Sequence, residues 1–262
     1  MIFEEKLLEE NRQYWSWRAP SYSELNREEL TNGRHRRWKE CLRGEIAAHF
    51  PGRKADTIRV LDIGTGPGFF AILLRELGHD VTAIDLTAAM LEEAKVNAGE
   101  FADSIRFMEM NAQELDFDDD RFDVIVSRNL TWNLPDPDKA YAEWIRVLKP
   151  GGLLLNFDAN WYAYLFDAKA CEEYARDRAV SAARGIEDRN VGENFDKMEE
   201  IARHIPLSSE RRPAWDLRVL HGIGGVTADA DETAWDRVWS EEEKINFAST
   251  PLFMVRGWKC GT

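Results

Sequence analysis

Between residues 58 and 158, short apolar segments alternate with segments of helical periodicity, and this alternation is the strongest constraint on the fold. The apolar segments lie at residues 58–63, 80–85, 105–110, 122–127 and 153–158, with helical segments at 69–77, 87–99 and 136–148. Thr87 and the Asp136–Pro137 pair are typical helix starts, and Gly78 is a typical helix end. Strands and helices alternating in this way predict a parallel β-sheet covered by helices on both faces.

The segments on either side of this region have different patterns. Residues 1–48 are charged and helical in pattern, and they contain an aromatic cluster that includes Trp15 and Trp17. Residues 159–212 show no strand pattern and predict a helical insertion. Residues 225–230 and 252–258 predict two more strands, paired antiparallel at one edge of the sheet. We expect all 262 residues to form a single domain.

Composition excludes several classes of protein. The net charge is −14, which argues against a dedicated nucleic-acid-binding protein because phosphate backbones repel an acidic surface. No run approaches the ~18–20 apolar residues of a membrane span, and the acidic N-terminus does not resemble a signal peptide. Three scattered cysteines indicate reduced thiols in a cytoplasmic protein, and no Cys or His spacing fits a metal site.

A glycine-rich loop follows the first predicted strand, in the sequence Asp62-Ile-Gly-Thr-Gly-Pro-Gly68. Glycines at a strand-to-helix turn let a ligand approach the backbone. Asp85 ends the second strand, where a carboxylate can accept both hydroxyls of an adenosine ribose. The carboxylate of Asp62 disfavours a pyrophosphate but attracts an ammonium group. Phe69 stands where the glycine motif of nicotinamide-binding proteins requires its third glycine. These residues together predict a nucleoside with an amino-acid tail, which is S-adenosylmethionine (SAM).

The ordered set of motifs resembles the class I SAM-dependent methyltransferases, in particular the type-11 group. It consists of the loop 62–68, Asp85, and the segments 111–113, 122–125 and 146–152. The resemblance implies a Rossmann-like α/β sheet of seven strands in the order 3-2-1-4-5-7-6 with strand 7 antiparallel. It also implies a helical lid over 1–48, a SAM-binding core over 58–158, a cap over 159–212 and final strands within 213–262.

The resemblance also implies a set of cofactor-binding residues. The glycines shape the methionine pocket, Asp62 places its amino group, Asp85 holds the ribose, and Tyr22 of the lid reaches the carboxylate. Asn111 stands where most relatives have aspartate. The complete expected set is Tyr22, Asp62, Gly64, Thr65, Gly66, Gly68, Asp85, Leu86, Met90, Asn111, Ala112, Gln113 and Arg128.

The methyl acceptor is expected to bind at the loops after the fourth and fifth strands, because ligands bind α/β sheets at that edge. Asp158 is the candidate base or substrate anchor, and Asn129 is the second candidate catalytic residue. The expected walls of the acceptor site are Trp17, Trp132, Asn160, Trp161 and Tyr162. Aromatic walls suit a cationic amine or a flat aromatic molecule, so N-, O-, S- and C-methylation all stay open.

Motifs that characterise nucleic-acid methylation are absent, because Ser127-Arg-Asn-Leu130 follows the fourth strand and no Pro-Cys nucleophile is found. A small-molecule acceptor is therefore favoured, and both a monomer and a homodimer fit the sequence. Two alternatives remain. In the first alternative, the SAM pocket serves other chemistry or the sensing of SAM. An acceptor pocket blocked by side chains of residues 128–133 and 158–162 would indicate this alternative. The second alternative is a nicotinamide-dependent oxidoreductase.

Overall fold

A computed structural model describes residues 3–188 and 195–261, and its centre is a mixed β-sheet. In these residues the sheet has seven strands in the order β3-β2-β1-β4-β5-β7-β6, as predicted. β1 to β5 pair in parallel, and β7 is antiparallel to both β5 and β6. The strands are β1 (Arg59–Ile63), β2 (Asp80–Asp85), β3 (Ile105–Glu109), β4 (Phe122–Arg128), β5 (Leu148–Asp158), β6 (Val226–Asp231) and β7 (Phe253–Lys259).

Helices cover both faces of the sheet and its carboxyl edge. They are α1 (Phe3–Thr31), α2 (Gly33–His49), α3 (Phe69–Glu76), α4 (Ala88–Ala98), α5 (Pro137–Val147), α6 (Ala168–Ala183), α7 (Phe195–Ala202), α8 (Ala214–Gly222), α9 (Ala234–Val238) and α10 (Glu241–Asn246). The predicted caps are confirmed, since Thr87 accepts a hydrogen bond from the Met90 N–H and Asp136 accepts one from the Lys139 N–H. These side chains satisfy amide groups that the first turn of a helix leaves free.

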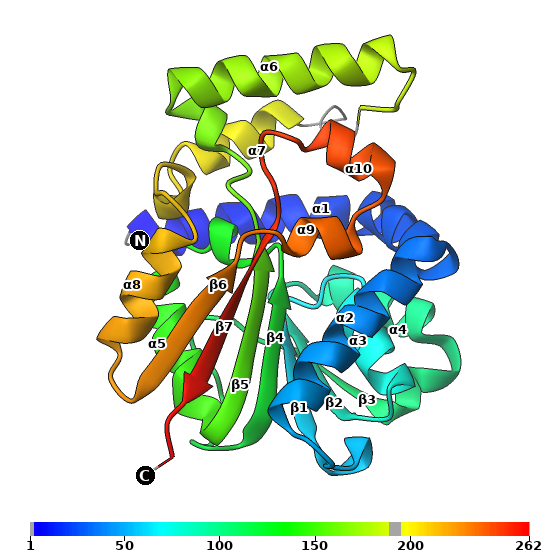
Figure 1. The fold of residues 1–262 in the computed structure, drawn as a ribbon, viewed down its shortest axis with the longest axis vertical. Coiled ribbons are helices and arrows are strands. Elements are labelled where there is room, and N and C mark those ends of the chain that lie inside the picture. Colours follow the sequence, from blue (N-terminus) through cyan, green and yellow to red (C-terminus); the bar gives the residue numbers. More distant parts are fainter. Residues whose placement is uncertain (1–2, 189–194, 262) are drawn as a thin grey trace.

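Two apolar layers hold the helices on the sheet. On one face, Trp38 of α2 packs edge-to-face on Phe70 and Phe157, with ring centroids 5.2 and 5.1 Å apart. On the other face, Tyr141 of α5 packs on Trp215 of α8 with centroids 5.9 Å apart. α1 crosses the carboxyl ends of the strands, and α6 and α7 lie beyond it, so the N-terminal helix is enclosed between the sheet and the insertion (Figure 1).

Several boundaries differ from the sequence expectation. The N-terminal region is two helices because Asn32 ends the first and caps the second with its side chain. β6 and β7 pair antiparallel as predicted, but residues 232–252 between them contain α9 and α10 rather than a simple hairpin turn. The insertion contains α6 and α7, while its residues 189–194 lie outside the described part of the chain.

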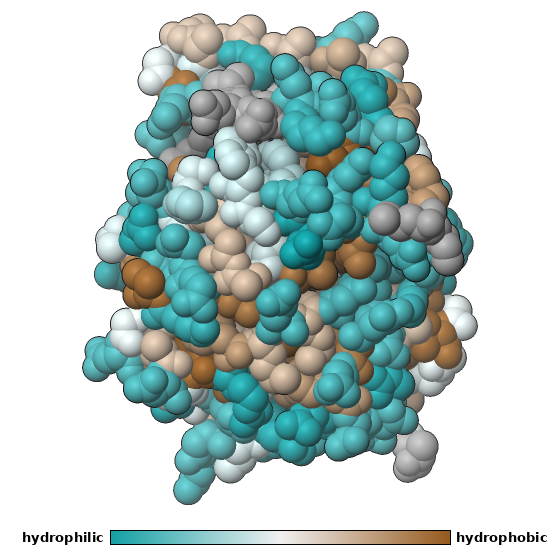
Figure 2. Space-filling view, turned by 180° about the vertical axis from the view of Figure 1, so that it is seen from behind, coloured by the Kyte–Doolittle hydropathy of each residue, from teal (hydrophilic) through white to brown (hydrophobic). Residues whose placement is uncertain are grey.

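The surface is mainly hydrophilic. Figure 2 shows polar residues over much of the face opposite that in Figure 1, with smaller apolar areas between them. The large apolar side chains exposed among the described residues are scattered, at Phe3, Trp17, Val96, Phe166 and Val180. No helix within residues 3–188 and 195–261 has the length and apolar character needed to cross a bilayer.

A buried ionic network ties the end of β5 to α8. The Arg212 guanidinium donates to Asp158 Oδ2 at 2.5 Å and to the two oxygens of Asp216 at 2.6 and 2.9 Å. Tyr141 donates to Asp216 at 2.6 Å and accepts from Asn156 at 2.8 Å. The side chains of Arg212 and both aspartates are completely buried. Burial is tolerable here because each charge has hydrogen-bonded partners of opposite sign.

Replacing the central cation tests this network. Arg212→Leu leaves two buried carboxylates without their partner, and we expect it to lower the free energy of unfolding by about 3–5 kcal/mol. Urea denaturation monitored by tryptophan fluorescence measures the change. The matched control is Arg211→Leu, since the neighbouring Arg211 is exposed and its change should stay within about 0.5 kcal/mol. Equal stability of the two variants would contradict the assignment.

Candidate functional site

Three cavities meet at the carboxyl edge of the sheet. The loop cavity, with an empty volume of about 750 Å³, lies between α1 and the loops after β1, β2, β3 and β4. The aromatic chamber, of about 540 Å³, is lined by Trp15, Tyr22, Asn129, Trp132, Trp161, Tyr162 and Tyr164. The charged chamber, of about 830 Å³, contains Arg18, Glu29, Arg34, Arg128 and Glu243 in its wall. Tyr22 and Asn129 line all three cavities.

Two glycines bring the backbone to the wall of the loop cavity. Gly64 and Gly66 both line it, with φ values of +68° and +53°, a region that side chains with a Cβ rarely adopt. A Cβ at Gly64 would lie 2.7 Å from Leu130 Cδ2. Gly68, with φ of +93°, faces the other way, because its Cβ would lie 3.1 Å from the Cβ of Ala94 in α4. Gly68 therefore permits close packing of the loop on α4, and its role in shaping the pocket stays a prediction.

Asp85 is placed in the loop cavity and also holds the glycine loop. Its Oδ2 accepts from the Gly66 N–H at 2.9 Å, and its Oδ1 accepts from the Thr87 N–H and hydroxyl, both at 3.0 Å. Burial raises the pKa of Asp85, and the hydrogen bonds from Thr87 and Gly66 oppose that rise. Leu86 and Met90 line the same region of the cavity. The carboxylate thus stands at a cavity wall with its orientation fixed.

Asp62 lies behind the loop and does not line the cavity. Its Oδ2 accepts a hydrogen bond from the Thr65 hydroxyl at 2.6 Å, and both residues are buried. Burial raises the pKa of Asp62 to about 7, although the hydrogen bond from Thr65 opposes the rise. Both residues stabilise the shape of the loop from inside, and their contact with a ligand stays a prediction.

The raised pKa of Asp62 makes stability depend on pH. Between about pH 4 and about pH 7 the folded state holds a proton on Asp62 that the unfolded state has lost, so the free energy of unfolding falls as pH rises through this range. Asp62→Asn removes this dependence while keeping an acceptor for Thr65. Urea denaturation at pH 5, 6, 7 and 8 measures the free energy of unfolding of both proteins. The difference between the variant and the wild type should shift in favour of the variant up to about pH 7 and stay constant above it. Asp56→Asn, at an exposed aspartate, is the control and should follow the wild type.

The loop after β3 forms one end of the loop cavity through Met110, Asn111 and Ala112. Asn111 Oδ1 accepts from the backbone and side-chain N–H groups of Gln113 at 3.0 and 3.3 Å. Gln113 does not line the cavity. Its Oε1 accepts from the Asp136 N–H at 2.6 Å, so it connects the loop to the start of α5 and positions Asn111. The contact of Gln113 with a ligand stays a prediction.

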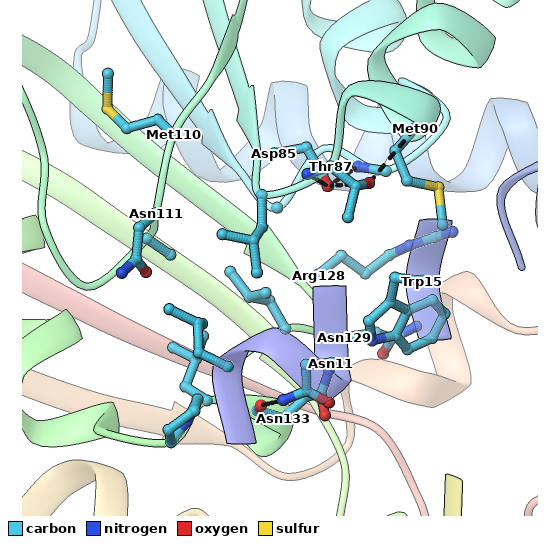
Figure 3. A pocket seen from close by; sticks show the side chains of 18 of the residues that line it. Asn11, Trp15, Asp85, Thr87, Met90, Met110, Asn111, Arg128, Asn129 and Asn133 are labelled. Carbon is cyan, nitrogen blue, oxygen red and sulfur yellow. Dashed lines mark hydrogen bonds between the residues drawn. The ribbon is translucent and has the colours of Figure 1, made fainter. Parts of the chain in front are cut away.

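α1 closes the loop cavity from above. The Asn11 amide donates to the carbonyl of Asn133 at 2.9 Å, and both residues lie on the side of the cavity opposite Asp85 (Figure 3). The Asn97 amide donates to the Ser23 hydroxyl at 3.0 Å and so fixes α1 on α4. The sequence pointed to this role only through the aromatic cluster around Trp15. No local sequence pattern indicates that Leu8, Asn11 and Asn133 line the cavity.

Arg128 connects the loop cavity with the charged chamber. Its guanidinium donates to Glu29 at 2.7 Å, and its Cζ lies 4.4, 5.3 and 5.5 Å from the ring centroids of Phe69, Trp38 and Phe70. Aromatic faces attract a cation, so these three rings and the carboxylate hold Arg128 in one orientation. The predicted position of Arg128 at a cavity wall is consistent with this arrangement.

The aromatic chamber brings together Trp132, Trp161 and Tyr162, three of the five residues expected as acceptor walls. The rings of Trp132 and Tyr162 lie 5.0 Å apart, and the Trp132 indole N–H donates to the Asn129 carbonyl at 3.0 Å. Tyr164, which the sequence reasoning missed, extends this wall and stacks on Tyr174 at 4.1 Å. The chamber is open rather than filled by the loops that surround it.

The other expected acceptor residues do not line any of these three cavities. Asp158 is fully buried, pairs with Arg212 and accepts from the Trp132 N–H at 2.9 Å, so it positions Trp132 and is not a base facing an acceptor. Asn160 exchanges hydrogen bonds of 3.1 and 3.2 Å with the backbone of Arg212. Trp17 is 44% exposed on the outer side of α1. These positions do not support the acceptor roles expected of the three residues, which stay predictions.

Asn129 has the features of a functional position. It follows β4 directly, and its φ of +56° lies in the left-handed region, which is uncommon for a residue other than glycine. Its side-chain Oδ1 is buried and has no hydrogen-bond partner in the described part of the chain. An unpaired buried oxygen at the junction of three cavities is available to a ligand group.

The comparisons with known proteins agree with this geometry. The profile of a methyltransferase-domain family matches residues 61–156, which contain the glycine loop, Asp85 and Asn129. Residues 61–156 of this chain therefore resemble a methyltransferase domain. A solved structure of similar fold, a putative S-adenosyl-L-methionine-dependent methyltransferase from Methanococcus maripaludis, has a TM-score of 0.56 and 20% identity, with 94% of each chain covered.

Curated relatives resemble the methyltransferase domain over part of their length. The demethylmenaquinone methyltransferase of Deinococcus radiodurans is 39% identical over 139 residues, covering 52% of this chain and 55% of the relative. The ubiquinone/menaquinone biosynthesis C-methyltransferase of Vibrio vulnificus is 36% identical over 143 residues, covering 52% of each. The chain thus spans about half the length of the curated relatives it matches.

Proposed function

We propose that the protein transfers a methyl group from SAM to a small-molecule acceptor. The observation that carries this proposal is the meeting of three cavities at Tyr22 and Asn129. Methyl transfer requires a site for the adenosine, a site for the methionyl tail and a site for the acceptor, which must converge on the methyl group. The three cavities supply these sites, and their junction is where methyl transfer would take place.

The loop cavity suits adenosine. Asp85 has carboxylate oxygens oriented by Gly66 and Thr87, so its remaining lone pairs can accept hydrogen bonds from the ribose hydroxyls. Leu86 and Ala112 offer apolar surface to an adenine ring, and Asn111 offers polar atoms to its edge.

The charged chamber suits the zwitterionic methionyl tail. Its Glu29 carboxylate can receive an ammonium group, and Arg34 and Arg128 can receive a carboxylate. Arg34 and Arg128 both contact Glu29, at 3.7 and 2.7 Å, so the chamber already contains the pairing of charges that an amino acid requires. Tyr22 at the entrance is the lid residue that we propose beside this tail.

The acceptor is proposed to bind in the aromatic chamber. SAM supplies an electrophilic methyl group on a sulfonium; the acceptor forms the new bond to carbon while the carbon–sulfur bond breaks. Asn129 Oδ1 faces this junction and can accept a hydrogen bond from an O–H or N–H nucleophile, which fixes its direction of approach. α1 and the aromatic walls border the junction, from which methyl transfer requires that water be excluded.

Ligand-dependent stabilisation tests the cofactor. Thermal unfolding with S-adenosylhomocysteine, SAM and NADH in parallel should show stabilisation by the first two alone, by about 2.7 kcal/mol at a hundredfold excess over the dissociation constant. Stabilisation by NADH alone would instead support the oxidoreductase alternative. The absence of a shift with either sulfur nucleoside would refute the proposal.

Asp85 gives a sharper test of the adenosine assignment. Asp85→Ala removes a charged acceptor for the ribose, and each such bond contributes about 1.5–3 kcal/mol, or about 10- to 100-fold in affinity. Calorimetric titration with S-adenosylhomocysteine measures this loss. Asp80→Ala, at the exposed opposite end of β2, is the matched control and should bind normally. Unchanged affinity in Asp85→Ala would exclude the ribose role.

The open aromatic chamber also bears on the remaining alternative, a SAM-binding protein with other chemistry or a sensing role. That alternative expects the loops 128–133 and 158–162 to block the acceptor pocket. Trp132, Trp161 and Tyr162 from these loops instead surround an empty volume of about 540 Å³. An acceptor-sized space beside the cofactor cavity supports transfer of the methyl group to a second molecule.

A further inference from the structure

We propose that the methyl acceptor is an amine and that the walls of the aromatic chamber hold the positive charge on its nitrogen. This inference rests on the proposed function, because it assigns the aromatic chamber to the acceptor. Its basis is the kind of side chain that lines this chamber, namely three tryptophans, three tyrosines and Asn129. It narrows the reaction from the N-, O-, S- and C-methylation that the sequence leaves open to N-methylation.

The walls of the aromatic chamber differ in kind from those of the loop cavity. Of the residues that the structure describes, no aliphatic residue and no phenylalanine lines the aromatic chamber. The loop cavity is lined by four leucines and two methionines in addition to Trp15 and Tyr22. Aliphatic side chains can bury a neutral apolar group as well as aromatic ones can, whereas the electron-rich faces of Trp and Tyr also attract a cation. Walls in which Trp and Tyr replace the aliphatic residues therefore favour a cation.

The charges around the aromatic chamber agree with this preference. In the described part of the chain no charged side chain lines it, so an anion bound there would have no ionic partner. The Glu199 carboxylate accepts a hydrogen bond from the Tyr164 hydroxyl at 2.6 Å, which makes that ring more electron-rich. Burial raises the pKa of Tyr162, and the charge of Glu199 adds to this rise more than the charge of Arg18 opposes it. The balance of charge at this wall is therefore negative.

Transfer to an amine moves a positive charge into the aromatic chamber. An amine that has lost its proton to solvent presents a neutral nitrogen with a lone pair, and Asn129 Oδ1 can accept a hydrogen bond from its N–H. The nitrogen bonds to the methyl carbon while the carbon–sulfur bond breaks, and the electron pair of that bond stays on sulfur. The sulfonium becomes a neutral thioether and the nitrogen becomes an N-methylammonium. Walls that attract a cation therefore bind the transition state more strongly than the neutral amine, which accelerates the transfer.

The test uses three probes of similar shape that differ in charge: choline, its neutral carbon analogue 3,3-dimethylbutanol, and the anion 3,3-dimethylbutanoate. Each is titrated calorimetrically into protein saturated with S-adenosylhomocysteine, whose neutral thioether leaves the place of the methyl group free. The wild type should bind choline about tenfold more tightly than the neutral alcohol, with the anion weakest.

Two variants test whether the aromatic walls cause this preference. Trp132→Leu and Tyr164→Leu each replace an electron-rich ring by an aliphatic side chain, and both positions line the aromatic chamber but neither of the other two cavities. Each should lower the preference for choline over the alcohol by about threefold or more. The matched control is Trp258→Leu, at a half-buried tryptophan that pairs with Leu153 near the opposite end of β5, and it should retain the preference.

The dissociation constant of S-adenosylhomocysteine separates this inference from the proposed function. It should agree within about twofold between the wild type and the variants, because neither ring lines the loop cavity or the charged chamber. A wild type that binds the alcohol or the anion as tightly as choline, or that fails to bind choline, would overturn the inference. So would an unchanged preference in both variants. Failure of the wild type to bind S-adenosylhomocysteine would instead refute the proposed function itself.

Discussion

The position of β1 between β2 and β4 determines where the site can form. Parallel strands end at the same edge of a sheet, so the glycine loop after β1 emerges between Asp85 of β2 and Asn129 after β4. The hydrogen bond from Gly66 to Asp85 then joins the ends of β1 and β2. One carboxylate thereby fixes the shape of the loop and faces the cavity, so the architecture and the candidate binding site depend on the same contact.

α1 completes the site from the opposite side, and it does so with residues distant in sequence. Asn11 bonds to the turn after β4, Ser23 bonds to α4, and Glu29 pairs with Arg128. Each contact fixes a different point of the helix, so Trp15 and Tyr22 between them are held over the cavities. This attachment gives the proposed lid a defined position relative to the glycine loop.

The sequence allowed the sheet order to be predicted through the motif resemblance, and strand and helix boundaries through periodicity and local capping signals. Asp85 and the glycine loop were placed correctly at a cavity because their roles depend on local backbone geometry. The interior contacts of Asp62, Gly68 and Gln113 could not be predicted, because only tertiary packing determines them. A side chain at the correct element can still point away from the ligand.

Asp158 illustrates the same limit more strongly. Its position at the end of a parallel strand is typical of a catalytic residue, yet its partner Arg212 lies 54 residues further along the chain. No local pattern predicts that pairing. The result is a carboxylate that supports the acceptor wall through the Trp132 backbone, which places it behind the site.

The likeness to other methyltransferases applies unequally to the two sides of the site. The matched region, residues 61–156, contains Asp85, Asn111 and Asn129, which belong to the loop cavity. Most of the aromatic chamber, including Trp15 and residues 161–164, lies outside it. The similarity therefore supports the proposed donor side, whereas the quinone-related names of the curated relatives do not determine the acceptor. The acceptor has to be inferred from the chamber itself, whose aromatic walls come mostly from α1 and from the segment after β5.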